Sequence, residues 1–289
     1  MTQTIRIGGV TEHFNLPWNL AIENKLFERK GVNVAWHYFP GGTGAMTTAL
    51  GDGTLDVAIL LTEGFLTAAL KGLRARIVKE YITSPLGWGI FTGYHSPISS
   101  VYAKTQKRYA ISKRGSGSHL MALIHARQRG EHISPEQWIE VKSLEGAVES
   151  LSRQETNVFY WEKYTTKPFV INGQLRMIGE FSAPWSSFLI VATEEILQNA
   201  RKEITMMLDI INEVSRSFVS DPSSINFLKV RFGMSEQDAH DWLRATVWSD
   251  DYTLRRQGLE NALYALKSAG ISAGDFHIES YCDSMVRLI

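Results

Sequence analysis

The stretch VNVAWHYFPGGTGAMTTALGDGTLDVAILL, residues 32–61, decides the fold class. Residues 32–39 are rich in β-branched and aromatic side chains and predict a strand. Residues 44–50 then predict a short helix that stops at Gly51, and residues 56–61 predict a fully buried strand. Strand, helix and strand in this order are typical of a parallel sheet covered by helices.

The same alternation extends on both sides of this stretch. Upstream, residues 5–10 predict a strand, and residues 17–30, with an early proline and Gly31 at the end, predict a helix. Residues 63–71 predict a helix that ends before Gly72. A second α/β unit follows, with expected strands at 109–112, 138–141 and 158–161 and expected helices at 119–128 and 144–153.

Two short apolar segments, residues 88–92 and 187–192, are expected to be the crossings between the two units. From residue 194 to about 270 the pattern is helical, and this tail is expected to pack on the first unit. The prediction is an α/β protein with two lobes, each a mixed, mostly parallel sheet flanked by helices. The expected first lobe comprises residues 1–89 and 190–289, and the second comprises residues 90–189.

Composition excludes several classes of protein. The 289 residues carry 30 basic and 30 acidic side chains, so the chain lacks the basic excess that nucleic-acid binding requires. The single cysteine, Cys282, excludes a disulfide framework or a thiolate metal cluster built from this chain. No apolar window is long enough to span a membrane, and the start of the sequence has no signal-peptide pattern. We therefore expect a cytoplasmic protein whose partner is a small molecule.

Ligands of open α/β sheets lie beyond the carboxyl ends of the strands, so the residues just after each strand are the candidate site. Glycine-rich helix starts there offer backbone N–H groups to an anionic or carbonyl oxygen. Hydroxyl and amide side chains supply further hydrogen bonds, and indole rings supply stacking. In the first unit the candidates are His13, Asn15, Trp18, Gly42, Thr43, Gly44, Thr62 and Glu63.

The second unit repeats this arrangement. Its candidates are Ser116, Gly117, Ser118, His119, Trp161 and Glu162. Trp18 and Trp161 are expected to stack on a flat or apolar part of the ligand. Glu63 or Glu162 is expected to pair with an amino group. Two lobes that each offer a glycine-rich helix start and an aromatic ring predict a cleft that closes on a small molecule.

Common enzyme motifs are absent. No G-x-G-x-x-G follows the first strand, residues 41–45 lack the G-K-[ST] ending of a nucleotide phosphate loop, and residues 115–119 do not fit G-x-S-x-G. His13 and His119 lack metal-ligand spacing, and Cys282 near His277 in sequence does not establish a nucleophile pair. The sequence therefore favours a binding protein over an enzyme, with no metal and no cofactor.

The sequence resembles the type II periplasmic binding protein fold, in the branch of nitrate, sulfonate and thiamine-pyrimidine binding proteins related to the fungal thiamine-pyrimidine synthases. Four blocks carry this resemblance: residues 5–9 (IRIGG), 20–27 (LAIENKLF) followed by Gly31-Val32, 40–44 (PGGTG) and 53–58 (GTLDVA). Residues 114–121 (RGSGSHLM) and 161–168 (WEKYTTKP) look like a narrower group, found in bacteria and as cytosolic proteins in fungi such as Candida, without an assigned ligand.

The resemblance implies two lobes, joined by two hinge strands, that close on a small polar or anionic organic molecule such as a pyrimidine or a sulfonate. It also brings two alternatives. One is an enzyme of thiamine-pyrimidine biosynthesis that uses pyridoxal phosphate, although such synthases carry a cysteine-rich run that this sequence lacks. The other is an exported receptor of an ABC transporter, whose relatives carry a signal or a lipid-attachment cysteine at the start.

Overall fold

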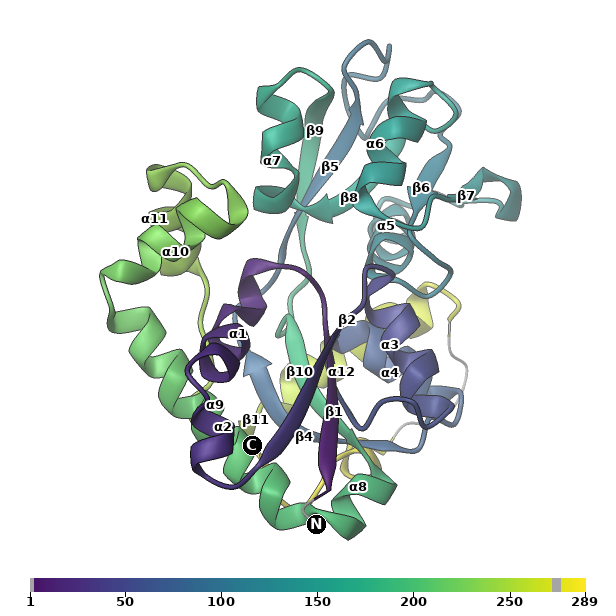
Figure 1. Ribbon diagram of the computed structural model, residues 1–289. Coiled ribbons are helices and arrows are strands. Elements are labelled where there is room, and N and C mark those ends of the chain that lie inside the picture. Colours follow the sequence, from purple (N-terminus) through teal and green to yellow (C-terminus); the bar gives the residue numbers. More distant parts are fainter. Residues whose placement is uncertain (1–2, 272–276) are drawn as a thin grey trace.

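The computed structural model describes residues 3–271 and 277–289, which form two lobes, each built on a five-stranded sheet (Figure 1). The first sheet has the order β2-β1-β3-β10-β4 and the second has the order β7-β6-β8-β5-β9. The first comprises β1 (Thr4–Gly9), β2 (Asn33–Tyr38), β3 (Val57–Leu61), β4 (Ala75–Ile82) and β10 (Phe188–Thr193). The second comprises β5 (Gly87–Gly93), β6 (Tyr109–Ile111), β7 (Trp138–Glu140), β8 (Val158–Glu162) and β9 (Leu175–Ser182).

The two sheets follow one plan. In the first, β1 pairs in parallel with β2 and β3, while β10 is antiparallel to both β3 and β4. In the second, β6 pairs in parallel with β7 and β8, while β5 is antiparallel to both β8 and β9. Each antiparallel strand arrives from the other lobe, so each sheet contains one strand that follows a crossing. The expected fold class, two lobes with mixed, mostly parallel sheets, is confirmed.

The crossings lie outside the apolar segments in which we expected them. β4 ends at Ile82 and β5 begins at Gly87, so the first crossing is residues 83–86. The second lies between Ser182 and Phe188, at residues 183–187. The two apolar segments are instead interior strands, since residues 88–92 lie in β5 and most of 187–192 lies in β10. Their apolar composition is explained by burial, because each strand is paired on both sides. The expected lobe boundaries, 89/90 and 189/190, fall inside β5 and β10.

Helices connect the strands much as the sequence predicts. The connecting helices are α1 (Leu16–Glu23), α2 (Leu26–Arg29), α3 (Gly42–Gly51), α4 (Thr62–Leu70), α5 (Gly117–Gln128), α6 (Leu144–Ser152) and α7 (Lys163–Ile171). One difference is that the single helix expected over residues 17–30 is two helices. Lys25 has a left-handed backbone (φ 54°), and the Asn24 amide donates to the Leu20 carbonyl, which ends the first helix.

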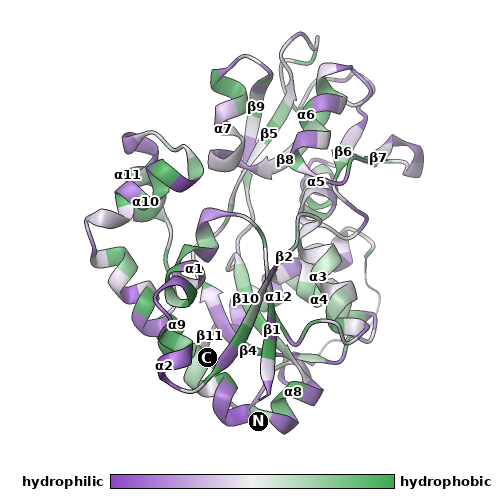
Figure 2. Ribbon diagram, in the orientation of Figure 1, coloured by the Kyte–Doolittle hydropathy of each residue, from purple (hydrophilic) through white to green (hydrophobic). Residues whose placement is uncertain are grey.

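The last third of the chain is helical and covers the first lobe (Figure 1). It comprises α8 (Glu194–Asn199), α9 (Arg201–Ser220), α10 (Ser223–Phe232), α11 (Glu236–Ala245) and α12 (Arg256–Ser268), with the short strands β11 (Thr253–Leu254) and β12 (Arg287–Leu288). The breaks expected near Pro222 and Gly233 are present, and the Ser235 hydroxyl caps α11 by accepting from the Asp238 amide. Polar and apolar residues alternate around α9, whose apolar side packs inward (Figure 2). No helix in the described part of the chain has the length and apolar content needed to cross a bilayer.

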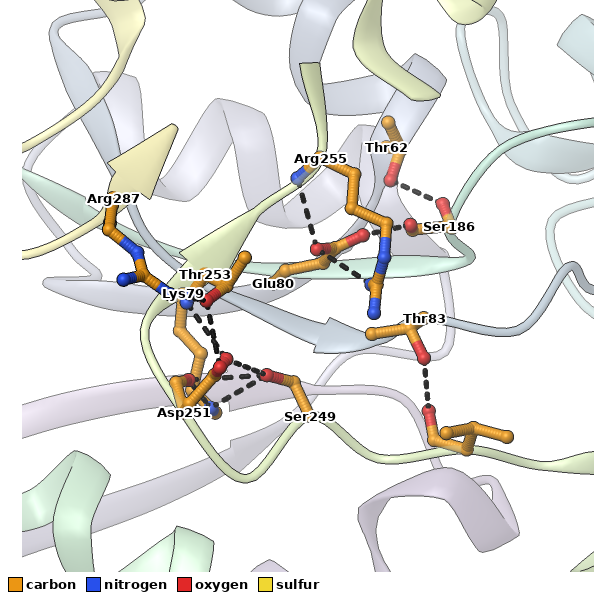
Figure 3. Close-up of polar contacts among 11 residues, drawn as sticks. Thr62, Lys79, Glu80, Thr83, Ser186, Ser249, Asp251, Thr253, Arg255 and Arg287 are labelled. Carbon is orange, nitrogen blue, oxygen red and sulfur yellow. Dashed lines mark hydrogen bonds and ion pairs between the residues drawn. The ribbon is translucent and has the colours of Figure 1, made fainter. Parts of the chain in front are cut away.

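Buried polar contacts fix the C-terminal segment and one crossing to the first sheet (Figure 3). The Glu80 carboxylate on β4 accepts from the Ser186 hydroxyl in the second crossing and from the backbone and guanidinium of Arg255. The neighbouring Lys79 donates to the Ser249 hydroxyl and to the Asp251 carbonyl. This group, Lys79, Glu80, Ser186 and Arg255, is called the β4 cluster below.

Candidate functional site

A cavity of about 360 Å³ lies between the lobes, at the ends of the strands. Its walls come from both lobes and from the first crossing. They are Val10, Thr11, Glu12, Phe39, Pro40, Gly42, Thr43, Leu61, Leu86, Trp88, Ser112, Ser116, Gly117, Ser118, Ser143, Leu144, Glu145, Trp161, Glu162, Thr165 and Phe188. Its volume and its mainly apolar walls with a few polar groups suit a small organic ligand.

The first-lobe wall contains the start of α3. This helix begins at Gly42, two residues earlier than expected, so Gly42 and Thr43 form its first turn. Gly42 has a positive φ of 62°, which a residue with a side chain rarely adopts. The Thr43 hydroxyl accepts from the Leu61 amide at 3.1 Å and so fixes the helix start to the end of β3. The Gly42 N–H donates to the Phe39 carbonyl at 2.9 Å, so the N–H groups that follow it in this turn are the ones available to a ligand.

The second-lobe wall contains the start of α5. The hydroxyls of Ser116 and Ser118 lie 3.0 Å apart, and Ser118 also accepts from the Ser112 amide at 3.0 Å. Gly117 between them has no room for a side chain, because a Cβ there would lie 2.5 Å from Leu61 and from the Trp88 ring. The close approach at Gly117 therefore joins this helix start to residues of the first lobe and of β5.

The two glycine-rich helix starts face each other. A Cβ placed on Gly44 would lie 3.6 Å from the Ser116 nitrogen and 3.7 Å from the Arg114 carbonyl oxygen, so α3 and α5 approach across the cleft. Farther out, the Lys167 ammonium on α7 pairs with the Asp238 carboxylate on α11, which joins the second lobe to the C-terminal helices. The lobes are therefore closed over the cavity.

Of the two tryptophans expected to stack on a ligand, only Trp161 lines the cavity. Its ring stacks on Phe159 with centroids 5.2 Å apart, and its indole nitrogen is buried and has no hydrogen-bond partner in the described protein. Trp18 is a correction. It is fully buried in the first lobe, against Phe27 and Trp36, and does not reach the cavity. Its position near a strand end does not determine where its side chain points. In the structure Trp18 lies on α1, and its side chain packs in the core.

Two carboxylates, Glu162 and Glu12, line the cavity from opposite lobes. Glu162 is 3% exposed and caps α7 by accepting from the backbone and hydroxyl of Thr165, at 2.7 and 2.9 Å. Burial raises the pKa of Glu162 to about 7 despite these hydrogen bonds. Burial and the nearby Glu162 raise the pKa of Glu12 to about 8. Both side chains are thus acids that titrate near neutral pH.

His13 lies behind this pair and not in the cavity wall. Its ring packs on Trp242 with centroids 4.4 Å apart, and burial lowers its pKa to about 3, so it is neutral. Its Nε2 lies 3.7 Å from Glu162 Oε2, which is too long for a hydrogen bond. His13 therefore gives Glu162 no counter-charge, and it does not line the cavity in which we expected it to contact a ligand.

Four further candidates hold the structure in place without lining the cavity. The Asn15 amide donates to the Val10 carbonyl at 2.9 Å, and the His119 ring accepts from the Gly115 amide at 3.1 Å. The Thr62 hydroxyl donates to the Ser186 carbonyl at 2.6 Å, and Glu63 accepts from the Trp185 indole at 2.9 Å. Thr62 and Glu63 therefore hold the second crossing, which passes directly over the end of β3.

Seven of the fourteen predicted site residues line the cavity: Gly42, Thr43, Ser116, Gly117, Ser118, Trp161 and Glu162. Sequence reasoning missed Glu12, although it directly follows β1, and it missed the start of α6 at Ser143 and Glu145, although these residues follow β7. The strand-end rule applied to every strand finds all three. Within residues 3–271 and 277–289, no group of histidine, cysteine and acidic side chains could hold a metal ion.

Comparison with known proteins agrees with this architecture. A family model for Ca3427-like periplasmic binding proteins matches residues 88–181. The solved structure of the Candida albicans CA3427 gene product, which exhibits the generic periplasmic binding protein fold, superposes with a TM-score of 0.88 at 23% identity. The match covers 98% of this chain and 97% of that chain. The chain has the type II periplasmic binding protein fold.

Sulfonate-binding proteins share this fold. The alkanesulfonate-binding protein SsuA from Xanthomonas axonopodis pv. citri, solved with MOPS bound, has a TM-score of 0.80 at 15% identity over 100% of both chains. SsuA from Escherichia coli has a TM-score of 0.63 at 17% identity, over 94% of this chain and 87% of that chain. No curated protein sequence matches this chain significantly. These superpositions show a common fold, and the low identities leave the ligand to be argued from the cavity.

Proposed function

We propose that this protein binds a small organic molecule in the cavity between its lobes and does not transform it. One observation carries the proposal: two helix starts from opposite lobes, at Gly42–Thr43 and Ser116–Ser118, line a single cavity between the lobes. Each offers first-turn N–H groups to a carbonyl or anionic oxygen of the ligand. A ligand that contacts both helix starts stabilises the closed arrangement of the lobes.

Aromatic walls support a ligand with a flat or apolar part. Trp161, Trp88, Phe39 and Phe188 line the cavity. A few well-placed hydrogen bonds of about 1.5–3 kcal/mol each suffice for micromolar affinity once ordering costs are subtracted. Pyrimidines have the flat shape that these walls suit, and a sulfonate group, as in the ligands of SsuA proteins, has acceptor oxygens of the kind that helix starts bind.

The alternative functions have less support from the residues present. Over residues 3–271 and 277–289, no lysine lines the cavity, so the cavity does not fit a pyridoxal phosphate held as an imine. Some proteins of this fold belong to ABC-type import systems, such as a ligand-binding component from Staphylococcus aureus. We propose instead a cytoplasmic binder that acts without a transporter, a location that cell fractionation tests.

A calorimetric screen of pyrimidines, sulfonates and nitrate tests the proposal, together with native mass spectrometry of the protein as purified. Ser116→Ala and Trp161→Ala are expected to weaken binding of the best compound about tenfold each. If both variants bind that compound as tightly as the wild type does, the cavity is not the binding site.

A matched glycine pair sharpens this test. Gly117→Ala places a Cβ 2.5 Å from Leu61 and from Trp88, so closure is blocked and binding is expected to be lost. Gly44→Ala is the control, because its Cβ would have only ordinary contacts of 3.6 Å or more. Equal affinities in the two variants would contradict closure around the ligand at this place.

A further inference from the structure

The charged residues that line the cavity are all acidic. They are Glu12, Glu145 and Glu162, and among the described residues that line the cavity there is no lysine, arginine or histidine. Glu145 is exposed at the start of α6, whereas Glu162 is buried and Glu12 is partly buried. The helix N-termini in this cavity would attract an anionic ligand. The Glu12 and Glu162 carboxylates in the same cavity would repel it.

The basic groups nearest Glu162 along the chain are paired with other acids. The Lys163 ammonium lies 3.4 Å from the Glu180 carboxylate, and Lys167 pairs with Asp238 on α11. His13 is neutral and lies beyond hydrogen-bond distance of Glu162. Lys163 still attracts the Glu162 carboxylate electrostatically, but among the described residues neither Glu12 nor Glu162 forms an ion pair with a lysine or an arginine.

Buried carboxylates without a counter-ion are costly, and proteins keep them where a ligand supplies the missing charge. The walls around this pair indicate what kind of cation fits. Ca²⁺ and Mg²⁺ need six or more oxygen ligands, whereas the walls beside the two carboxylates include the rings of Trp88, Trp161, Phe39 and Phe188. Aromatic faces and carboxylates together favour an organic cation.

We propose that the ligand carries a cationic nitrogen, an ammonium or amidinium group, which binds between Glu12 of the first lobe and Glu162 of the second. The inference rests on the proposed function and names the ligand class of the same cavity. Such a group would also join the two lobes, because its two carboxylate partners come from opposite lobes. Simple sulfonates and nitrate are then poor ligands, whereas a molecule with both a basic nitrogen and an acceptor oxygen is a good one.

Three flat probes of nearly equal shape test this charge preference: benzamidinium, benzamide and benzoate. Calorimetry at pH 8 is expected to rank them cation first, neutral amide second and anion last, with benzamidinium about tenfold tighter than benzamide. Glu12→Gln and Glu162→Gln are each expected to weaken benzamidinium about tenfold and to leave benzamide within about threefold. Glu28→Gln and Glu155→Gln, which change exposed glutamates of the two lobes, are the matched controls and are expected to bind as the wild type does.

The possible results separate the inference from the proposed function. If benzoate binds as tightly as benzamidinium, the charge preference is wrong. If the ranking survives in Glu12→Gln and Glu162→Gln, the assignment of the cation to these two carboxylates is wrong. In both cases small-molecule binding stands. If none of these probes and no compound of the wider screen binds, the proposed function fails and this inference fails with it. Loss of benzamidinium binding in Gly117→Ala, with retention in Gly44→Ala, places the cation in this cavity.

Discussion

The β4 cluster and the cavity hold carboxylates that are equally buried and differently partnered. Glu80 is 1% exposed and accepts from the Arg255 guanidinium and the Ser186 hydroxyl, whereas Glu162 is 3% exposed and accepts from Thr165 and from the Tyr164 backbone, both of its own helix start. A buried charge is stable when it is paired and hydrogen-bonded. The difference indicates that Glu80 serves the fold and that Glu162 serves a ligand that brings its own charge.

Neutralising each carboxylate in turn is expected to give unequal losses of stability. Glu80→Gln is expected to lower the free energy of unfolding by about 2 kcal/mol, because Arg255 and Ser186 lose a charged partner. Glu162→Gln is expected to cost less than about 0.5 kcal/mol, because its amide oxygen still caps α7 and a repulsive charge is removed. Urea denaturation at pH 8 measures both. Equal losses in the two variants would show that Glu162 is a structural residue.

The pH dependence of stability is the next largest expected effect. Glu12 and Glu162 have pKa values of about 8 and 7, against ordinary values near 4.5 in the unfolded chain. Between pH 6 and 8 the folded protein therefore holds protons that the unfolded chain has lost, so the free energy of unfolding falls as the pH rises. Glu12→Gln is expected to show a shallower fall, and Glu28→Gln is expected to follow the wild type. A slope in Glu12→Gln as steep as that of the wild type would contradict a buried, unpaired Glu12.

Lys79 in the β4 cluster changes the free energy of unfolding with pH in the opposite direction to Glu12 and Glu162. Burial lowers its pKa to about 8 against the attraction of Asp251, so above pH 8 the unfolded chain binds a proton that the folded protein has lost. This contribution makes stability rise with pH and is common to the wild type and the Glu12→Gln variant. The difference between their two pH curves therefore isolates Glu12.

The smallest expected effect is at the ion pair between the lobes. Lys167 is 44% exposed and Asp238 is 10% exposed, so their attraction is partly screened by water. Asp238→Asn is expected to weaken ligand affinity by about threefold or less and to loosen the closed state slightly. Small-angle scattering with and without ligand, beside calorimetry, measures both changes. A loss as large as that of Gly117→Ala would mean that this pair, and not the cavity, holds the lobes closed.

Local pattern was enough to predict most of the fold. The apolar run of β3 (Val57–Leu61), the glycine after each early helix and the Ser235 cap are signals carried by neighbouring residues. The crossings could not be placed in this way, because an apolar strand that is paired on both sides and an apolar crossing have the same composition. Only the pairing of β5 and β10 with strands of their new lobes distinguishes them.

The site was predictable to the extent that backbone position decides it. Ser116, Gly117 and Thr43 follow strands and begin helices, and their place alone puts them in the cavity wall. Trp18 and His13 could not be assigned from position, since the direction of a side chain depends on the core around it. Glu12 stood in a segment that sequence reasoning had already selected. Its proposed role depends on Glu162, which is 150 positions away in the sequence. Only the three-dimensional structure shows that the two carboxylates line the same cavity.

Proton release on binding tests the central claim most directly. Calorimetry of benzamidinium binding at pH 7 in two buffers with different ionisation enthalpies counts the protons exchanged. A cation that enters between Glu12 and Glu162 stabilises their ionised forms, so the account predicts proton release to the buffer, and less release in Glu12→Gln. Binding with the same enthalpy in both buffers would contradict the claim that these two carboxylates hold the ligand.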